Sequence, residues 1–333
     1  MRTVLITRLD NDGDVLLAGP AIRAVAATDR VVLLVAPSGE QAARLLPGIY
    51  DLLVWPCPWT GFRPPAVDRR SVETLIEVLS LAHLGAAFVL TSYHQSSLPM
   101  ALILRMAGIQ NVAAASEDYP GALLDLRHRA PADHEVVRQL SLVRAAGYEL
   151  PPGDDGGLAV RRTRPAEQPE RPYVVVHPGA SVPARAAGPQ WLADVVDALV
   201  AAGHEVVVTG SPAERDLTKV VAGSNGIDLG GQTGYGRLAE VLRAASCVVV
   251  GNTGPAHLAA AVRTPVVSLF APVVPAGQWA PWQVPSILLG DQQAECRGSR
   301  ARECPIPGHP CLSGIAADEV VVAVGKLIEE VAG

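Results

Sequence analysis

Short apolar runs alternate with helix-like stretches along almost the whole chain, and no other feature limits the fold as strongly. Such alternation is typical of parallel sheets that are covered by helices on both faces. The predicted strands are residues 4–7, 31–36, 52–55, 88–90, 112–114, 173–177, 205–209, 227–229, 247–250 and 266–270. The predicted helices are residues 15–27, 71–84, 97–107, 133–146, 190–202, 213–222, 236–245 and 317–331. The sequence therefore predicts an α/β protein with doubly wound, Rossmann-like sheets.

The alternation is interrupted once, which predicts two domains. Residues 151–172 begin with Pro151-Pro152-Gly153 and have no apolar periodicity, as expected of a linker. A chain of 333 residues is also long for a single core. We expect domains at residues 1–150 and 173–333 with a cleft between them, and the last helix is placed to pack back on the N-terminal domain.

Composition excludes some classes of protein. The formal net charge of −6 argues against a general nucleic-acid binder. No apolar run reaches the roughly 18 residues that span a bilayer. The apolar run at residues 4–6 is too short for a signal peptide. We expect a cytoplasmic protein, with peripheral contact to a membrane left open.

Residues 248–261 predict an anion-binding turn. The strand Val248-Val249-Val250 is followed by the turn Gly251-Asn252-Thr253-Gly254, and Pro255 suits the first position of a helix. Free N–H groups and the positive end of the helix dipole attract anions at such a helix start. Thr253 and His257 add side-chain donors. The alternative is an ordinary strand-to-helix turn without a ligand.

Two further turns in the second half carry polar groups. His177-Pro178-Gly179-Ala180-Ser181 follows its first strand, where Gly179 permits close approach of a ligand and Arg185 suits a phosphate. Thr209-Gly210 precedes Glu214, which is a candidate acceptor for ribose hydroxyls. The alternatives are a solvated Arg185 and a Glu214 that only favours a helix N-terminus. Parallel strands bring such turns to one sheet edge.

The first strand ends in an acidic loop. Asp10, Asp12 and Asp14 crowd the turn that Gly13 permits. Three roles are compatible with this spacing: an N-cap at Asp12 or Asp14, a cation site, or a general base. Mutual repulsion is expected to raise the pKa of one carboxyl group.

Three cysteines and a histidine cluster near the end of the chain: Cys296, Cys304, His309 and Cys311. A structural Cys₃His zinc site is one interpretation, but the spacing lacks the usual Cys-x₂-Cys pair. A disulfide fits poorly with a cytoplasmic protein. A reduced loop is the favoured interpretation, so no metal site is predicted.

The order of the motifs resembles glycosyltransferase family 9, the ADP-heptose:lipopolysaccharide heptosyltransferases. The resemblance rests on Arg8-Leu9-x-x-x-Gly13-Asp14-Val15-Leu16-Leu17 with Pro20-Ala21-Ile22-Arg23, on residues 177–181, on Gly210-x-x-x-Glu214, and on residues 253–261. It extends over nearly the whole chain. It implies the GT-B architecture, two Rossmann-like domains across a cleft, with the acceptor in the N-terminal domain and the nucleotide-sugar in the C-terminal one.

The resemblance also implies roles for individual residues. Asp14 matches the proposed catalytic base, with Asp10, Asp12, Gly13, His94 and Gln95 assigned to the acceptor side. The residues assigned to the donor are His177, Gly179, Ser181, Arg185, Thr209, Gly210, Glu214, Asn252, Thr253, Gly254 and His257. Two departures stand out: Asn252 replaces an Asp, and Ala186-Ala187-Gly188-Pro189 replaces a Trp-Pro after the basic residue.

The resemblance implies inverting, metal-independent glycosyl transfer without a cofactor. The donor is a nucleoside-diphosphate sugar, with an ADP-linked heptose favoured, and the acceptor is a hydroxyl of a glycan or small molecule. The alternatives are a nucleotide-sugar epimerase of GT-B architecture and a non-catalytic nucleotide-sugar-binding protein. The acidic loop favours a transferase, because a sensor needs no base there.

Overall fold

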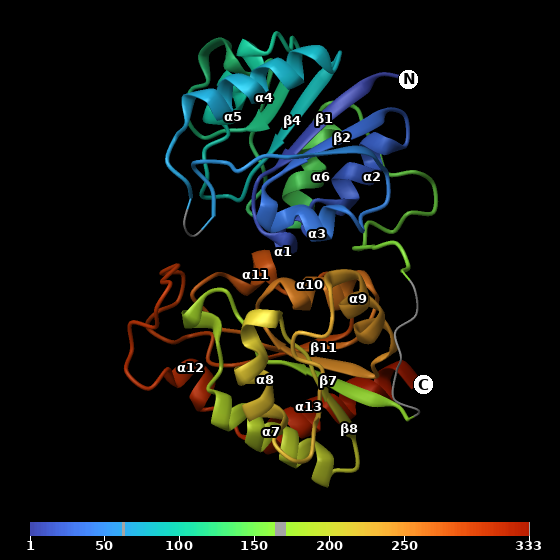
Figure 1. The fold of residues 1–333 in the computed structure, drawn as a ribbon, viewed down its shortest axis with the longest axis vertical. Helices are drawn as coiled ribbons and strands as arrows, with labels where there is room; N and C mark the ends of the chain where they lie inside the picture. The colour runs from blue at the N-terminus through green and yellow to red at the C-terminus, as the bar shows by residue number, and fades with distance from the viewer. Residues whose placement is uncertain (62–63, 164–170, 333) are drawn as a thin grey trace. The chain divides into compact units, whose positions relative to one another are not determined.

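The computed structural model describes residues 1–61, 64–163 and 171–332. The chain forms two compact units, Met1–Arg161 and Arg162–Gly333, each with one six-stranded sheet. Figure 1 shows helices on both faces of each sheet. The doubly wound α/β fold that the alternation predicted is therefore confirmed.

The first sheet has the strand order β3-β2-β1-β4-β5-β6, and every pair of neighbours is parallel. Its strands are β1 (Thr3–Arg8), β2 (Arg30–Val35), β3 (Ile49–Val54), β4 (Ala86–Leu90), β5 (Val112–Ala115) and β6 (Leu126–His128). The central strand β1 is buried from Val4 onward, because neighbouring strands and helices cover both of its faces.

Two groups of helices cover this sheet. On one face lie α1 (Asp12–Leu17), α2 (Gly19–Ala26), α3 (Glu40–Ala43) and α6 (Glu135–Ala145), and on the other α4 (Arg69–Leu81) and α5 (Leu98–Met106) (Figure 1). Short 3₁₀ turns occupy Pro37–Gly39 and Gly121–Leu123. Leu75 and Leu79 of α4 pack with Met100, Ile103 and Leu104 of α5 in the core.

The second sheet has the order β12-β11-β10-β7-β8-β9, again with parallel neighbours. Its strands are β7 (Tyr173–His177), β8 (Glu205–Val208), β9 (Ile227–Asp228), β10 (Cys247–Gly251), β11 (Val266–Leu269) and β12 (Ser286–Leu289). Figure 1 shows α7 (Pro189–Ala201), α8 (Arg215–Ala222) and α13 (Ala317–Ala332) on one face, and α9 (Tyr235–Ala244) and α10 (Gly254–Ala261) on the other. The remaining short helices are Pro183–Arg185, Pro212–Glu214, α11 (Ala276–Trp279) and α12 (Pro310–Ser313). The last helix, α13, packs on α7 and on strands of its own sheet.

One predicted helix was wrong, and two outer strands were missed. The helix expected at residues 15–27 is two helices that meet at Ala18, immediately before Gly19-Pro20. Proline lacks the N–H that would continue the first helix, and it fits the first turn of the second. The outer strands β6 and β12 were not predicted: β6 has no apolar run, whereas the short apolar run Ile287-Leu288-Leu289 of β12 was overlooked.

The expected linker begins against the first unit. Arg23 donates to both carboxylate oxygens of Asp154, at 2.6 and 2.8 Å, and also to the carbonyl of Gly157. Leu158 is buried nearby. Residues 164–170 lie outside the described part of the chain, so the division into domains at 150 and 173 stays a prediction. No helix among the described residues is long and apolar enough to cross a membrane.

Candidate functional site

The predicted donor residues gather at one edge of the second sheet. The chain runs outward from β7 to β9, returns to β10 beside β7, and then continues outward to β12. The point where the strand order reverses is where open α/β sheets bind ligands. The turns after β7, β8 and β10 follow three adjacent strands, so the sheet brings His177, Thr209 and Asn252 to the same edge.

The start of α10 presents backbone N–H groups at this edge. Thr253 is the extended N-cap, and no described side chain caps the helix there. The Thr253 hydroxyl instead donates to the carbonyl of Gly251 at 3.4 Å. His257 is buried within the second turn of the helix. Pro255 has no N–H and the N–H of Ala256 donates to the carbonyl of Thr253 at 3.1 Å, so the N–H of Gly254 is the group of this first turn that is best suited to an anion.

Asn252 has a structural role that the sequence did not reveal. Its side-chain amide donates to the carbonyl of Ala271 at 3.2 Å and accepts from the N–H of Ala271 at 3.3 Å. This pair ties the β10 turn to the segment that follows β11. A carboxylate could accept the N–H but would face the carbonyl oxygen without a proton to donate. The replacement of Asp by Asn thus gains one buried hydrogen bond here.

Arg185 lies next to the same turn. It ends the 3₁₀ turn Pro183–Arg185, and its Nη1 lies 3.5 Å from the carbonyl oxygen of Asn252. A Cβ on Gly251 would lie 3.0 Å from the carbonyl oxygen of Arg185, so glycine permits the two backbones to come close. The cation is therefore placed beside the helix start, where a phosphate would need it.

His177, Thr209 and Glu214 form the second part of this edge. His177 Nδ1 and the Thr209 hydroxyl lie 2.9 Å apart, and both side chains are buried. Burial lowers the pKa of His177 to about 4, in spite of the opposing charge of Glu214. The imidazole is consequently neutral at pH 7 and serves as a hydrogen-bonding group rather than a cation.

Glu214 caps its own helix. Its carboxylate accepts from the N–H of Ser211 at 2.7 Å, within a capping box. A Cβ on Gly179 would lie within 3 Å of this carboxylate, so Glu214 occupies the space that Gly179 leaves free. Gly210 is equally tight, against the side chain of Thr218. Ser181 is exposed.

A buried arginine organises the acidic loop of the first unit. Arg8, the last residue of β1, has no exposed side-chain surface. Its guanidinium lies 3.2 Å from Asp10, 3.0 Å from Asp14 and 3.8 Å from Glu135 of α6. It also donates to the Ser92 hydroxyl at 2.9 Å. Burial alone would lower the pKa of Arg8, but the three carboxylates raise it above its ordinary value.

The three predicted aspartates have different environments. Asp10 accepts from Gln95 at 2.5 Å besides pairing with Arg8, and Asp12 accepts the N–H of Ala42 at 2.9 Å. Asp14 is held by Arg8, yet 18% of its side chain is exposed. Asn11, not Asp12 or Asp14, occupies the N-cap of α1, so the capping role considered for them was wrong. Gly13 is buried inside α1 rather than in a turn.

Burial, not mutual repulsion, is the main reason why carboxyl groups of this loop titrate high. It raises the pKa of Asp12 to about 6, where no neighbouring carboxylate contributes. It also raises the pKa of Asp10, where Arg8 opposes the shift and Asp14 adds to it. The expected repulsion between carboxylates therefore contributes at Asp10, where burial is the larger cause, and does not contribute at Asp12.

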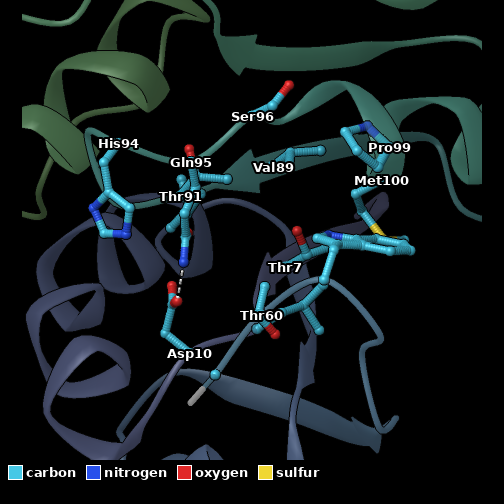
Figure 2. Close-up of a pocket in the computed structure, with 14 residues that line it drawn as sticks. Thr7, Asp10, Thr60, Val89, Thr91, His94, Gln95, Ser96, Pro99 and Met100 are labelled. Atoms are coloured by element: carbon cyan, nitrogen blue, oxygen red, sulfur yellow. Dashed lines mark hydrogen bonds between the residues drawn. The ribbon is translucent and has the colours of Figure 1, made fainter. Parts of the chain in front are cut away.

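A cavity of about 370 Å³ lies beside this loop, entirely within the first unit. It sits beyond the ends of β1 and β4, the neighbours at which the order of the first sheet reverses. Asp10 and Gln95 point toward one another on one wall of the cavity, with His94 nearby, while Pro99 and Met100 lie on the opposite side (Figure 2). His94 and Gln95, predicted for the acceptor side, thus line it together with Asp10.

Several residues of this region were missed by the sequence interpretation. Arg8 was quoted only as part of a motif, and Ser92, Glu135, Trp59 and Thr60 were assigned no role. One signal was available for Arg8, because a charged residue that ends a buried strand requires counter-charges. The position of Glu135 had no local signal.

The cysteine cluster forms no disulfide, since all five cysteines of the chain are free thiols. Burial, together with nearby Cys296 and Cys304, raises the pKa of Cys311 to about 11. Among the residues that the structure describes, no group of three or more His, Cys, Asp or Glu side chains is arranged to hold a metal ion.

Comparison with known proteins assigns the family. The model of glycosyltransferase family 9 (heptosyltransferase) matches residues 84–309. This chain belongs to glycosyltransferase family 9. The family resemblance that the motifs predicted is therefore confirmed.

Relatives of the family agree in sequence and in fold. The chain is 29% identical over 221 residues to lipopolysaccharide heptosyltransferase 3 of Escherichia coli (strain K12). The matched region covers 61% of this chain and 62% of that protein. The chain thus spans about three fifths of the length of this curated relative. A family 9 glycosyltransferase of Veillonella parvula superposes with a TM-score of 0.78 at 17% identity, over 99% of this chain and 97% of that one. E. coli heptosyltransferase WaaC with ADP-2-deoxy-2-fluoro heptose superposes with a TM-score of 0.70 at 20% identity, over 98% of this chain and 99% of that one. These structures share the GT-B fold.

The raised pKa of Asp12 predicts a pH-dependent stability. Because the folded-state pKa exceeds the unfolded value, the contribution of Asp12 to stability is fully present below pH 4 and is lost as the pH rises through about 6. Asp12→Asn removes this loss and keeps an oxygen for the N–H of Ala42. The variant should gain stability over the parent between pH 4 and 7, by at most about 3 kcal/mol and less where solvent screens the site.

Urea unfolding of both proteins at several pH values measures this difference. Asp118→Asn, which removes an exposed carboxylate of the same unit, is the matched control and should show no such trend. A difference between Asp12→Asn and parent that stays constant with pH would contradict the assignment.

Proposed function

We propose that this chain is an inverting glycosyltransferase that moves a heptose-type sugar from an ADP-linked donor to a hydroxyl of a glycan or small-molecule acceptor. The observation that carries the proposal is that this family 9 chain has two candidate sites, one in each unit. One sheet reverses its order beside an anion-binding helix start, and the other beside a buried carboxylate cluster. The ADP-heptose analogue named for E. coli WaaC supports an ADP-linked donor.

The second unit binds the donor in this proposal. The diphosphate is met by Arg185, by the Thr253 hydroxyl, by His257 and by the N–H of Gly254 at the start of α10. Glu214, fixed by its capping box, accepts a hydrogen bond from the ribose. The hydrogen bond between neutral His177 and Thr209 joins the turn after β7 to the turn after β8. These groups stabilise the charge that develops on the leaving nucleoside diphosphate.

Asp14 is the general base in this proposal. Both oxygens of Asp10 are engaged, by Arg8 and Gln95, and Asp12 is tied to the backbone of Ala42. In the interactions described for this unit, Asp14 contacts Arg8 and Ser92 only through its Oδ1 atom. The side chain of Asp14 is also partly exposed. Its Oδ2 can take the proton of the acceptor hydroxyl as that oxygen attacks the anomeric carbon.

Asp14→Asn should abolish sugar transfer while leaving donor affinity nearly unchanged. A general base contributes roughly 10²–10⁴-fold to the rate, and the amide cannot accept the proton. The measurement is turnover of ADP-heptose with acceptor, beside equilibrium binding of ADP. Asp12→Asn is the matched control and should keep most of the turnover. If Asp14→Asn retained more than about a tenth of it, the base would have to be sought at Asp10 or Asp12.

Arg185→Ala and His257→Ala should each weaken ADP binding by about 1.5–3 kcal/mol, the range for hydrogen bonds to charged groups. Binding of adenosine should change much less, since its contacts lie at Glu214 and nearby backbone. Calorimetry with both ligands separates the two cases. Equal losses for ADP and adenosine would mean that these residues support the fold and do not contact phosphate.

Transfer should survive exhaustive chelation with EDTA. The protein supplies its own counter-charges for the diphosphate, and Asp10 and Asp12 already bind Arg8, Gln95 and Ala42. The assay compares turnover before and after chelation, with Mg²⁺ or Mn²⁺ added back. Activity that is lost with EDTA and restored by either cation would refute the metal-independent mechanism. Conversion of the donor without any acceptor would instead favour the epimerase.

A further inference from the structure

We propose that the 370 Å³ cavity of the first unit selects an acceptor whose reacting sugar carries no anionic group. This inference rests on the proposed transferase function and specifies its acceptor. It is carried by the charges, the hydrogen bonds and the apolar wall of the cavity itself.

The described lining of the cavity contains no lysine or arginine that could pair with a carboxylate or phosphate of a substrate. Of its 14 described residues, Asp10 and His94 are the only ionisable ones apart from hydroxyl groups, and none is a lysine or arginine. His94 is exposed at the rim. An anionic group that entered would therefore face the carboxylate of Asp10, and like charges repel strongly in a partly buried site.

Among the described residues, the arginine that contacts Asp10 is already paired with carboxylates. Arg8 lies behind Asp10 with no exposed side-chain surface, and it is paired with Asp10, Asp14 and Glu135. One cation among three carboxylates leaves this group with an excess of negative charge. Arg8 therefore cannot turn toward an anionic ligand without leaving those carboxylates unpaired in the interior.

The orientation of Asp10 is also fixed. Gln95 donates to Asp10 through Nε2 and accepts the N–H of Ser92 through Oε1 at 3.1 Å, so its amide is held at both ends. Each oxygen of the Asp10 carboxylate has a second lone pair, so the fixed group can still accept a hydrogen bond from a substrate hydroxyl. Neutral hydroxyls, also offered by Thr7, Thr60, Thr91 and Ser96, complete the polar wall.

The other wall suits the carbon face of a sugar ring. Pro99 and Met100 lie on that side (Figure 2), and the apolar lining also includes Leu9, Trp59 and Val89. Trp59 packs edge-to-face on Trp55 with ring centroids 5.4 Å apart, and Trp55 is itself anchored by a hydrogen bond to Ser71. Apolar side chains together with hydroxyl groups and one hydrogen-bond-accepting carboxylate match a neutral pyranose, and the volume lies within the range of small-molecule sites.

Two matched probes test the proposal in the full-length chain without donor. Phenyl β-glucopyranoside and phenyl β-glucuronide differ only in a neutral CH₂OH against a carboxylate. We expect the glucoside to bind about tenfold or more tightly at pH 7.5 and low salt, measured by calorimetry or ligand-observed NMR. Trp59→Ala should weaken glucoside binding, which locates the probe in the cavity.

Two variants should shift this preference. Asp10→Asn removes the facing carboxylate and should reduce the ratio of the two affinities at least about threefold. Ser96→Lys adds a cation at an exposed lining position and should raise glucuronide affinity about tenfold, and it does not depend on the buried cluster for folding. Thr74→Lys, which adds the same charge on the exposed side of α4, is the control and should leave both affinities unchanged.

The outcomes are separable from those of the proposed function. Equal or tighter binding of the glucuronide, no binding of either probe, or a ratio unaffected by both variants would overturn the inference. A preference for the glucoside in a chain that never turns over ADP-heptose would refute the transferase and leave the selectivity of the cavity standing. Faster transfer to an anionic acceptor than to its neutral counterpart would overturn the selectivity of the cavity and leave the transferase function standing.

Discussion

The burial of Arg8 is the constraint on which the first unit depends. A guanidinium with no exposed surface at the end of the central strand is costly unless several carboxylates surround it. Asp10 and Asp14 come from the adjoining loop and helix, and Glu135 comes from α6. The same charges fix the orientation of the proposed base and give the neighbouring cavity its negative character. Fold and chemistry are therefore coupled through one ion cluster.

Both units place their polar residues at the point where the strand order of the sheet reverses. In the first sheet this lies between β1 and β4, and in the second between β7 and β10. Adjacent loops diverge at such a point and leave room for a ligand. The two edges nevertheless differ in chemistry: the first gathers carboxylates around a buried cation, whereas the second gathers a helix start, an arginine and a neutral histidine. This difference is what supports an acceptor at one edge and an anionic donor at the other.

Much of the fold followed from local sequence, and the failures have physical causes. The predicted strand at residues 173–177 is β7, and most other strands and helices lie within a few residues of their predicted bounds. The outer strand β6 was missed because a half-exposed strand needs no apolar run, and β12 was missed although Ile287-Leu288-Leu289 is apolar. The break at Ala18 was missed although Gly19-Pro20 signals it. The candidate sites were found as turns, since glycine and polar residues mark a turn locally, but their internal hydrogen bonds were not.

The sequence by itself determined the strand–helix alternation, the turns that follow the strands and the family to which the chain belongs. These depend on residue types that act within a few positions of one another. Only the tertiary structure decided that Glu135 completes the charges around Arg8, that Asn252 binds the backbone of Ala271, and that Glu214 fills the space above Gly179. Each of these contacts joins segments that are distant along the chain. Packing of whole elements sets their geometry, and no local pattern encodes it.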